Sequence, residues 1–177
     1  MFELFKKRKH SPKPTKTLRY KNWTEFTQNP HHQWIINDKY LLRSFQFFFE
    51  LLDQRANIFL SKNKINFIHT NGSFACGLTK TNQSYNIILF KEVVKFFYSA
   101  NPDVGIAILA HELGHFVHDH SQKFENGTID SKMAQLEADQ FAIDLGLIDP
   151  LETFLRDFSK HPDVTYRLRN IEIIRSK

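Results

Sequence analysis

One pentapeptide limits the possible folds of this chain more than any other feature, the sequence HELGH at positions 111–115. It follows the apolar run IAILA at 106–110. The preceding NPD at 101–103 is typical of a helix start, with a capping Asn, a Pro in the first turn and an early acid. We therefore predict a helix over about 102–119. The two histidines of the pentapeptide are four residues apart, so both imidazoles lie on one face of this helix.

These two histidines, His111 and His115, are close enough on that face to share one Zn²⁺ ion. Glu112 follows the first of them, where its carboxylate can accept a proton from the attacking water and pass it to the leaving amine. The sequence thus predicts one zinc ion per chain, with His111 and His115 as ligands and Glu112 as the catalytic base. The plainer interpretation is a helix with two surface histidines and no metal.

Helices and strands are predicted on both sides of this motif. Apolar residues recur at helical spacing from Asp38 to about Leu60, which indicates one long amphipathic helix. Asn71-Gly72 has the composition of a hairpin turn. The remaining predicted segments are short helical or irregular structure over 22–37, strands at 65–68, 73–76 and 85–90, and helices at 92–98, 131–145, 150–159 and 163–175. The predicted fold is therefore α+β, with a small antiparallel sheet flanked by helices.

Positive charge is concentrated at the beginning of the chain. Residues 1–21 contain eight Lys or Arg and one acid, whereas the remaining residues carry 16 basic and 18 acidic side chains. A basic tail on a nearly neutral body is not the pattern of a nucleic-acid-binding protein, and we expect no nucleic-acid partner. We predict a basic, flexible N-terminal arm over 1–21 and a single domain over 22–177. An alternative role for the arm is a weak electrostatic contact with an anionic membrane surface.

The compartment is predicted from what the sequence lacks. Cys76 is the single cysteine of the chain, which excludes an internal disulfide and suits a reducing compartment. The first residues do not have the order of a signal peptide, and no apolar run reaches the roughly 18 residues that a membrane-spanning helix needs. We therefore expect a soluble, cytoplasmic protein.

Three segments together resemble a known family. They are ILAHELGH at 108–115 followed by His120-Ser121, LEADQFA at 136–142, and the residues His161-Pro162, Thr165 and Arg167-Leu168. In this order they are similar to the HtpX/CAAX-prenyl-protease family of zinc metallopeptidases, within the gluzincins, whereas residues 1–63 carry no such resemblance. The resemblance implies a zincin metallopeptidase domain over 22–177, bound Zn²⁺, and endoproteolysis of peptide or protein substrates that add a strand to the edge of the sheet.

The third zinc ligand stays open. The family's third ligand is a Glu four residues before the Asp of Ala-Asp, and Gln135 stands at that position here. Glu137 matches a second Glu of the family that is not a ligand, and helical spacing puts it on the face opposite Gln135 and Asp139. Either Gln135 binds through its amide oxygen, or distortion brings Glu137 in, or Asp139 becomes the ligand. A fourth outcome is weak zinc binding with reduced activity. The resemblance also implies that Asp139 orients a ligand histidine from behind.

Further histidines also need assignment. His118 and His120 are expected in solvent or behind the ligands, because one helix rarely supplies three ligands to one zinc. The resemblance places His161 near the active site, where it can stabilise the oxyanion or occupy the open position of zinc; the alternative is that it only flanks the last helix.

Two rival functions stand beside the peptidase. One is a metal-binding protein that recognises peptides without cutting them, motivated by Gln135, and the other is a peptidase that inactivates a repressor, motivated by a similar short HELGH–EA(D/N)xFA layout.

Overall fold

The computed structural model of the protein describes residues 14–71, 78–80, 84–157 and 162–176. Helices dominate these residues, and one small sheet accompanies them. In chain order the elements are α1 (Lys16–Gln28), the 3-10 helix η1 (Pro30–His32), α2 (Gln33–Ile36), α3 (Lys39–Leu51), α4 (Gln54–Lys62), β1 (Ile65–Thr70), β2 (Leu78–Lys80), β3 (Tyr85–Phe90), α5 (Lys91–Phe96), α6 (Asp103–Val117), α7 (His120–Glu125), α8 (Ser131–Asp144), α9 (Ile148–Asp157) and α10 (Pro162–Arg175).

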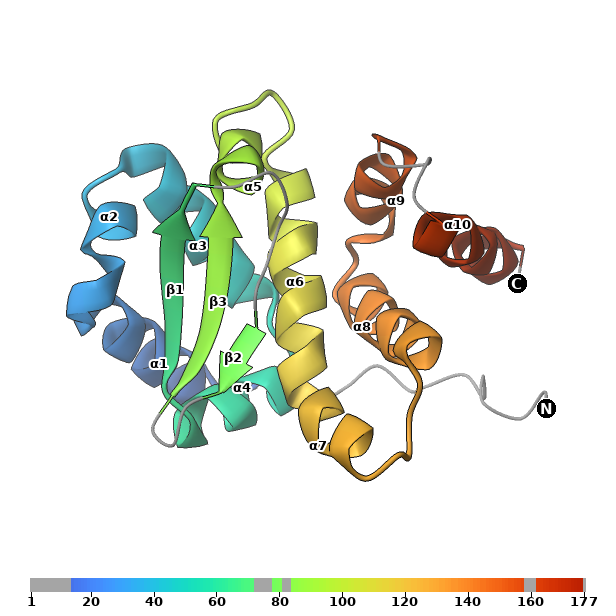
Figure 1. Cartoon of the computed structure of the whole chain (residues 1–177). Helices are drawn as coiled ribbons and strands as arrows, with labels where there is room; N and C mark the ends of the chain where they lie inside the picture. The colour runs from blue at the N-terminus through green and yellow to red at the C-terminus, as the bar shows by residue number, and fades with distance from the viewer. Residues whose placement is uncertain (1–13, 72–77, 81–83, 158–161, 177) are drawn as a thin grey trace.

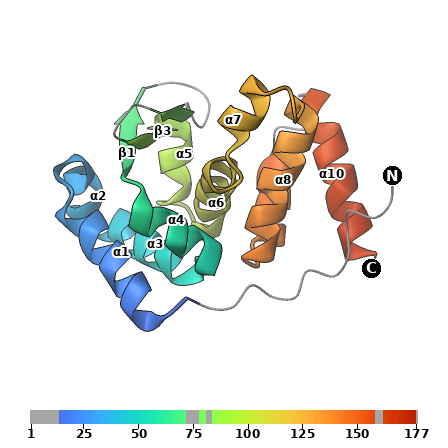
Figure 2. The same cartoon turned by 90° about the horizontal axis from the view of Figure 1, so that it is seen from below.

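Helix α6 occupies the centre of the molecule, between the sheet with its helices on one side and α8, α9 and α10 on the other (Figures 1 and 2). Every residue from Val104 to Gly114 is buried, because the helix is apolar around its whole circumference and must be covered on all sides. The HELGH pentapeptide therefore lies in the core helix of the fold. In the part of the chain that the structure describes, no helix is both long and apolar enough to span a bilayer.

The described strands form one sheet in the order β1-β3-β2. β2 is antiparallel to β3, but β1 is parallel to it, so the prediction of an antiparallel sheet is wrong for the β1–β3 pair. Polar side chains match the parallel register, because Asn66 lies opposite Asn86 and its Nδ2 donates to Asn86 Oδ1 at 2.9 Å. The predicted strand at 73–76, with Cys76, lies outside the described residues.

The predicted helix from Asp38 to Leu60 is in fact two helices, α3 and α4. The break follows Leu52, where the Asp53 carboxylate accepts from the backbone N of Ala56 at 2.9 Å and caps α4. Such a cap begins a new helix even though the apolar spacing continues through it. Apolar periodicity alone therefore overestimated the length of this helix.

Helix α1 begins inside the range that the sequence assigned to the basic arm. The Thr15 hydroxyl accepts from the backbone N of Leu18 at 3.3 Å and caps the helix, so residues 16–21 are helical. Residues 1–13 of the predicted arm lie outside the described residues.

The chain turns sharply at Asp119, between α6 and α7. Its φ of 53° and ψ of 45° are left-handed, a conformation that Asp adopts more readily than most residues other than Gly. This turn ends the predicted helix over 102–119 at Val117 and starts a separate short helix. It also brings His120, the first residue of α7, back against His115 of α6.

Helices α6 and α8 approach each other closely at Gly114. A Cβ atom at this position would lie 3.2 Å from both the Cα and the carbonyl O of Ala138, and 3.0 Å from Phe141 Cβ. The absent side chain therefore allows the α6–α8 contact, and this contact sets how near the two predicted ligand-bearing helices can come.

Candidate metal centre

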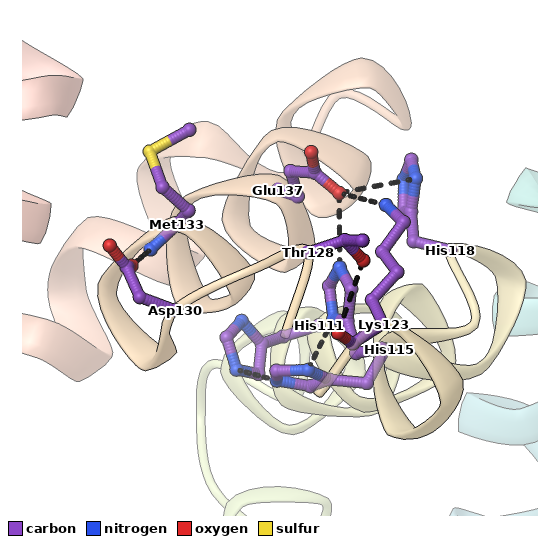
Figure 3. A network of polar contacts seen from close by, with 9 residues as sticks. His111, His115, His118, Lys123, Thr128, Asp130, Met133 and Glu137 are labelled. Atoms are coloured by element: carbon purple, nitrogen blue, oxygen red, sulfur yellow. Dashed lines mark hydrogen bonds and ion pairs between the residues drawn. The ribbon is translucent and has the colours of Figure 1, made fainter. Parts of the chain in front are cut away.

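The two histidines of α6 face each other within a network of polar contacts (Figure 3). His111 Nε2 and His115 Nε2 are 3.2 Å apart. Two nitrogen ligands, each about 2.0–2.1 Å from a tetrahedral zinc, are about 3.3 Å apart, so this separation matches one edge of a zinc tetrahedron. His111 is buried and His115 is partly buried.

Asp139 of α8 holds the other ring nitrogen of His111. Its Oδ1 accepts from His111 Nδ1 at 2.8 Å, and its Oδ2 accepts from Nε of Arg167, on α10, at 2.7 Å. A second guanidinium nitrogen, Nη2, donates to Oδ1. Asp139 is only 1% exposed, and a carboxylate buried this deeply needs a cation and several donors around it. Helices α6, α8 and α10 thus meet at His111.

A second chain of contacts reaches His115 from the α7 side. His115 Nδ1 lies 2.7 Å from His120 Nδ1, and His120 Nε2 lies 3.1 Å from Glu137 Oε2. The same carboxylate oxygen accepts from Lys123 Nζ at 2.8 Å and lies 3.8 Å from His118 Nδ1 (Figure 3). His120 is 2% exposed, so its ring is enclosed between these partners.

The hydrogen-bond partners determine which ring nitrogens carry protons. An ionised carboxylate only accepts, so His111 Nδ1 donates to Asp139. For the same reason His120 Nε2 donates to Glu137, which leaves Nδ1 of a neutral His120 to accept from His115 Nδ1. Both Nε2 atoms that face each other then present lone pairs. Two zinc-bound histidines require this arrangement, so the residues present fit a zinc ion.

Burial keeps both histidines of the pair neutral. It is the largest cause of the lowered pKa of His111, the Arg167 guanidinium adds to it, and Asp139 compensates only in part. Burial likewise lowers the pKa of His115, with His111 and His120 adding to the effect. Burial alone would raise the pKa of Asp139, but hydrogen bonds from His111 and Arg167 lower it. The site therefore combines neutral imidazoles with an ionised carboxylate behind one of them.

Comparison with known families gives an independent result. Residues 46–136 match the model of Peptidase family M48. The matched residues make up just over half of the chain. The chain belongs to peptidase family M48. Membership in M48 confirms the resemblance to the HtpX/CAAX-prenyl-protease family. It implies metallopeptidase activity in general, and M48 metallopeptidases are typically zinc-dependent. No curated protein and no solved structure matches the chain.

The three candidates for the third ligand of this M48 site lie in different places. Asp139 uses both of its oxygens in the contacts with His111 and α10. Glu137 is engaged by the residues of α7. The side chain of Gln135 interacts with the His111 ring and raises the pKa of that histidine. Among the residues that the structure describes, no three His, Cys, Asp or Glu side chains are grouped as ligands for one metal ion.

The structure places the other predicted site residues as follows. Glu112 follows His111 on α6 and is 9% exposed. His161 lies outside the described residues, so its role at the oxyanion or at the metal stays a prediction. His118 contacts Glu137 rather than the histidine pair.

Two contacts of the M48 site were not assigned by sequence reasoning. The resemblance includes Arg167 but gives it no role. A buried Asp that orients a ligand histidine needs a cationic partner. This requirement could have indicated an Arg in the last helix. His120 was expected in solvent or behind the ligands, and it lies behind His115 because of the left-handed turn at Asp119. No sequence pattern of this chain indicates that turn.

Proposed function

We propose that this M48 chain is a zinc-dependent peptidase in which His111 and His115 hold the metal and Glu112 is the catalytic base. The observation that carries the proposal is the pair of Nε2 atoms 3.2 Å apart, because the partners of the opposite ring nitrogens leave a lone pair on each of them. Two such lone pairs repel each other unless a cation or a proton lies between them. The partners behind each ring keep protons away from these atoms, which favours a metal ion.

For the third ligand we propose the amide oxygen of Gln135. Its side chain interacts with the His111 ring, whereas the carboxylates of Glu137 and Asp139 already have cationic partners. A neutral amide holds zinc less firmly than a carboxylate does. The zinc affinity should therefore be lower than that of a site with two histidines and a glutamate.

In the proposed reaction, different groups carry out different parts of peptide hydrolysis. Bound zinc would supply a Lewis acid that polarises the scissile carbonyl and makes water acidic enough to attack. The Glu112 carboxylate would accept the proton of the attacking water and deliver it to the leaving amine. Asp139, held by Arg167, keeps the His111 ring oriented with Nε2 toward the metal.

We further propose that the substrate is an extended, flexible peptide that binds along β2. This strand lies at an edge of the sheet, on the side drawn nearest α6 (Figure 1). An edge strand offers backbone donors and acceptors to a peptide of almost any sequence. Cleavage should therefore favour unfolded chains and show loose sequence preference.

Metal content and cleavage of fluorescent casein test the proposal. The parent and Glu112→Gln should each hold about one zinc per chain, whereas His111→Ala and His115→Ala should lose it. Glu112→Gln should cleave more than about a hundredfold more slowly than the parent, because it lacks the base. Gln140→Ala is a control on α8, since Gln140 donates to Asp144 and not to the site.

Full zinc occupancy in both histidine variants would contradict the assigned ligands. Cleavage by Glu112→Gln at the parental rate would contradict its role as the base. Gln135 favours a second candidate function, the binding of peptides without cleavage. A zinc-loaded parent that binds casein peptides but leaves them uncut would establish that function in place of the peptidase.

A further inference from the structure

We propose that His120 and Glu137 are positioning residues that fix the tautomer of His115 and so keep its Nε2 available to the metal. The inference rests on the proposed zinc site. It assigns a role to two side chains that the hydrolytic reaction itself does not use, and it accounts for the direction in which Glu137 points.

The need for such a device follows from a difference between the two histidines of α6. His111 donates from Nδ1 to Asp139, a carboxylate, so the position of its proton is fixed. His115 faces the Nδ1 atom of His120 at 2.7 Å instead. Between two imidazole nitrogens one proton can belong to either ring, so this contact alone does not decide which nitrogen of His115 is free.

Glu137 removes the ambiguity. Its Oε2 lies 3.1 Å from His120 Nε2, and because a carboxylate accepts only, that nitrogen must carry the proton of the ring. His120 Nδ1 is then an acceptor, His115 Nδ1 is the donor, and His115 Nε2 is left with its lone pair. The Glu137 carboxylate therefore determines which ring nitrogens carry protons along this series of contacts.

The carboxylate that imposes this order is itself held in place. Lys123 Nζ donates to Glu137 Oε2 at 2.8 Å, and Glu137 is a third exposed, whereas His120 is 2% exposed. Each ligand histidine is thus supported by an acid paired with a cation, Asp139 with Arg167 behind one and Glu137 with Lys123 behind the other. The second support contains an additional imidazole because α7, not α8, lies behind His115.

The tautomers can be measured directly in the metal-free parent chain, with no substitution that disturbs the fold. Long-range ¹H–¹⁵N correlation spectra of the imidazoles at neutral pH should show His111 and His115 protonated on Nδ1 and His120 protonated on Nε2, with assignments from single histidine variants. A His115 ring protonated on Nε2 would overturn the proposal.

Zinc affinity, measured by competition with a chromogenic chelator, tests the consequence. His120→Ala and Glu137→Ala should each weaken zinc by roughly ten- to a hundredfold, as is typical for partners behind a ligand. Their double variant should be no weaker than His120→Ala, because both act through one chain of contacts. Glu137→Gln should restore most of the affinity, since the amide oxygen still accepts from His120 Nε2. Gln140→Ala is the matched control on α8 and should stay within about twofold, because Gln140 donates to Asp144 and not to this chain of contacts.

Two outcomes contradict the proposal in distinguishable ways. If His120→Ala and Glu137→Ala bind zinc like the parent while His115→Ala has lost it, the positioning role alone is wrong. If His115→Ala also binds zinc like the parent, the zinc site itself is wrong and the positioning role falls with it. Loss of zinc in Glu137→Gln as complete as in His115→Ala would make Glu137 a ligand and would likewise overturn the proposal.

Discussion

At the scale of the residue, Gln135 is the position where the proposed ligand set departs from the pattern that the resemblance implies. It lies one helical turn before Asp139 on α8, so both side chains project from the same face toward α6. Asp139 is occupied in holding His111, and Gln135 is left beside the proposed metal with a neutral amide in place of the family's carboxylate. The overall charge of the proposed ligand set is consequently less negative by one than that of a set with two histidines and a glutamate.

The substitution Gln135→Glu should restore the missing charge. We expect zinc affinity to increase by at least about tenfold, because a carboxylate is a stronger zinc ligand than an amide, and cleavage of casein to increase with zinc occupancy. Zinc affinity is measured by competition with a chromogenic chelator. Gln140→Glu adds the same charge on α8 next to Asp144 and should leave zinc affinity nearly unchanged. Equal effects of the two substitutions would show that Gln135 does not face the metal.

At the scale of the element, the site depends on the contact between α6 and α8. Gly114 stands between Glu112 and His115 of the motif and packs against the backbone of Ala138, immediately before Asp139. The carbonyl of Ala138 cannot move away without moving the helix that carries Gln135. Packing of two helices and geometry of the site are therefore determined at one position.

Replacing this glycine should show the connection. In Gly114→Ala the new methyl group would press on α8, and overpacking of this kind costs about 1–3 kcal/mol. The gain in helix propensity from Gly to Ala, about 1 kcal/mol, offsets only part of that cost. We expect a net loss of unfolding free energy in urea and a weaker zinc affinity together. A variant that is more stable than the parent and binds zinc equally well would contradict the close packing of α6 and α8.

The helices of the second half were predictable because their signals are local. Gly146, with φ of 86°, ends α8 where the sequence places the end, and α10 begins beside the predicted Asp163. The pairing of β1 with β3 was not predictable in the same way. It joins strands 20 positions apart in parallel, and the Asn66–Asn86 contact that matches this register is visible only after the strands have paired.

In the candidate site, too, features of a single helix were predictable from the sequence, whereas contacts between helices were not. The spacing of His111 and His115 follows from the periodicity of a single helix. The partners of these residues do not, because each comes from another helix. Arg167 is 28 positions from Asp139, and His120 reaches His115 only through a left-handed residue that the sequence does not mark.

At the scale of the whole molecule, the site is assembled from four helices, α6, α7, α8 and α10. The match to the M48 model ends at residue 136, within α8. Asp139 and Arg167 lie beyond it, although they support His111. The C-terminal helix is therefore part of the site and not only a cover for α8 and α9.

Removal of the guanidinium should destabilise the whole protein. Arg167→Leu leaves the buried Asp139 without its cation, which should lower the free energy of unfolding by about 3–5 kcal/mol. Adding Asp139→Asn should recover part of this loss, because the uncompensated charge disappears. Urea unfolding in a metal chelator is the measurement, and Arg169→Leu on the exposed face of α10 is the control. A loss no larger than that of the control would show that the ion pair contributes little.

The separation of His111 and Arg167 along the chain has a consequence for the protein while it is being made. The two residues are 56 positions apart. A ribosome adds about 5–20 residues per second, so Arg167 is joined roughly 3–11 s after His111. During that interval the nascent chain contains the whole HELGH motif but not the cation that lets Asp139 enter the core. Until α10 has been made, Asp139 therefore lacks the guanidinium that holds it against His111, and the proposed metal site cannot be completed.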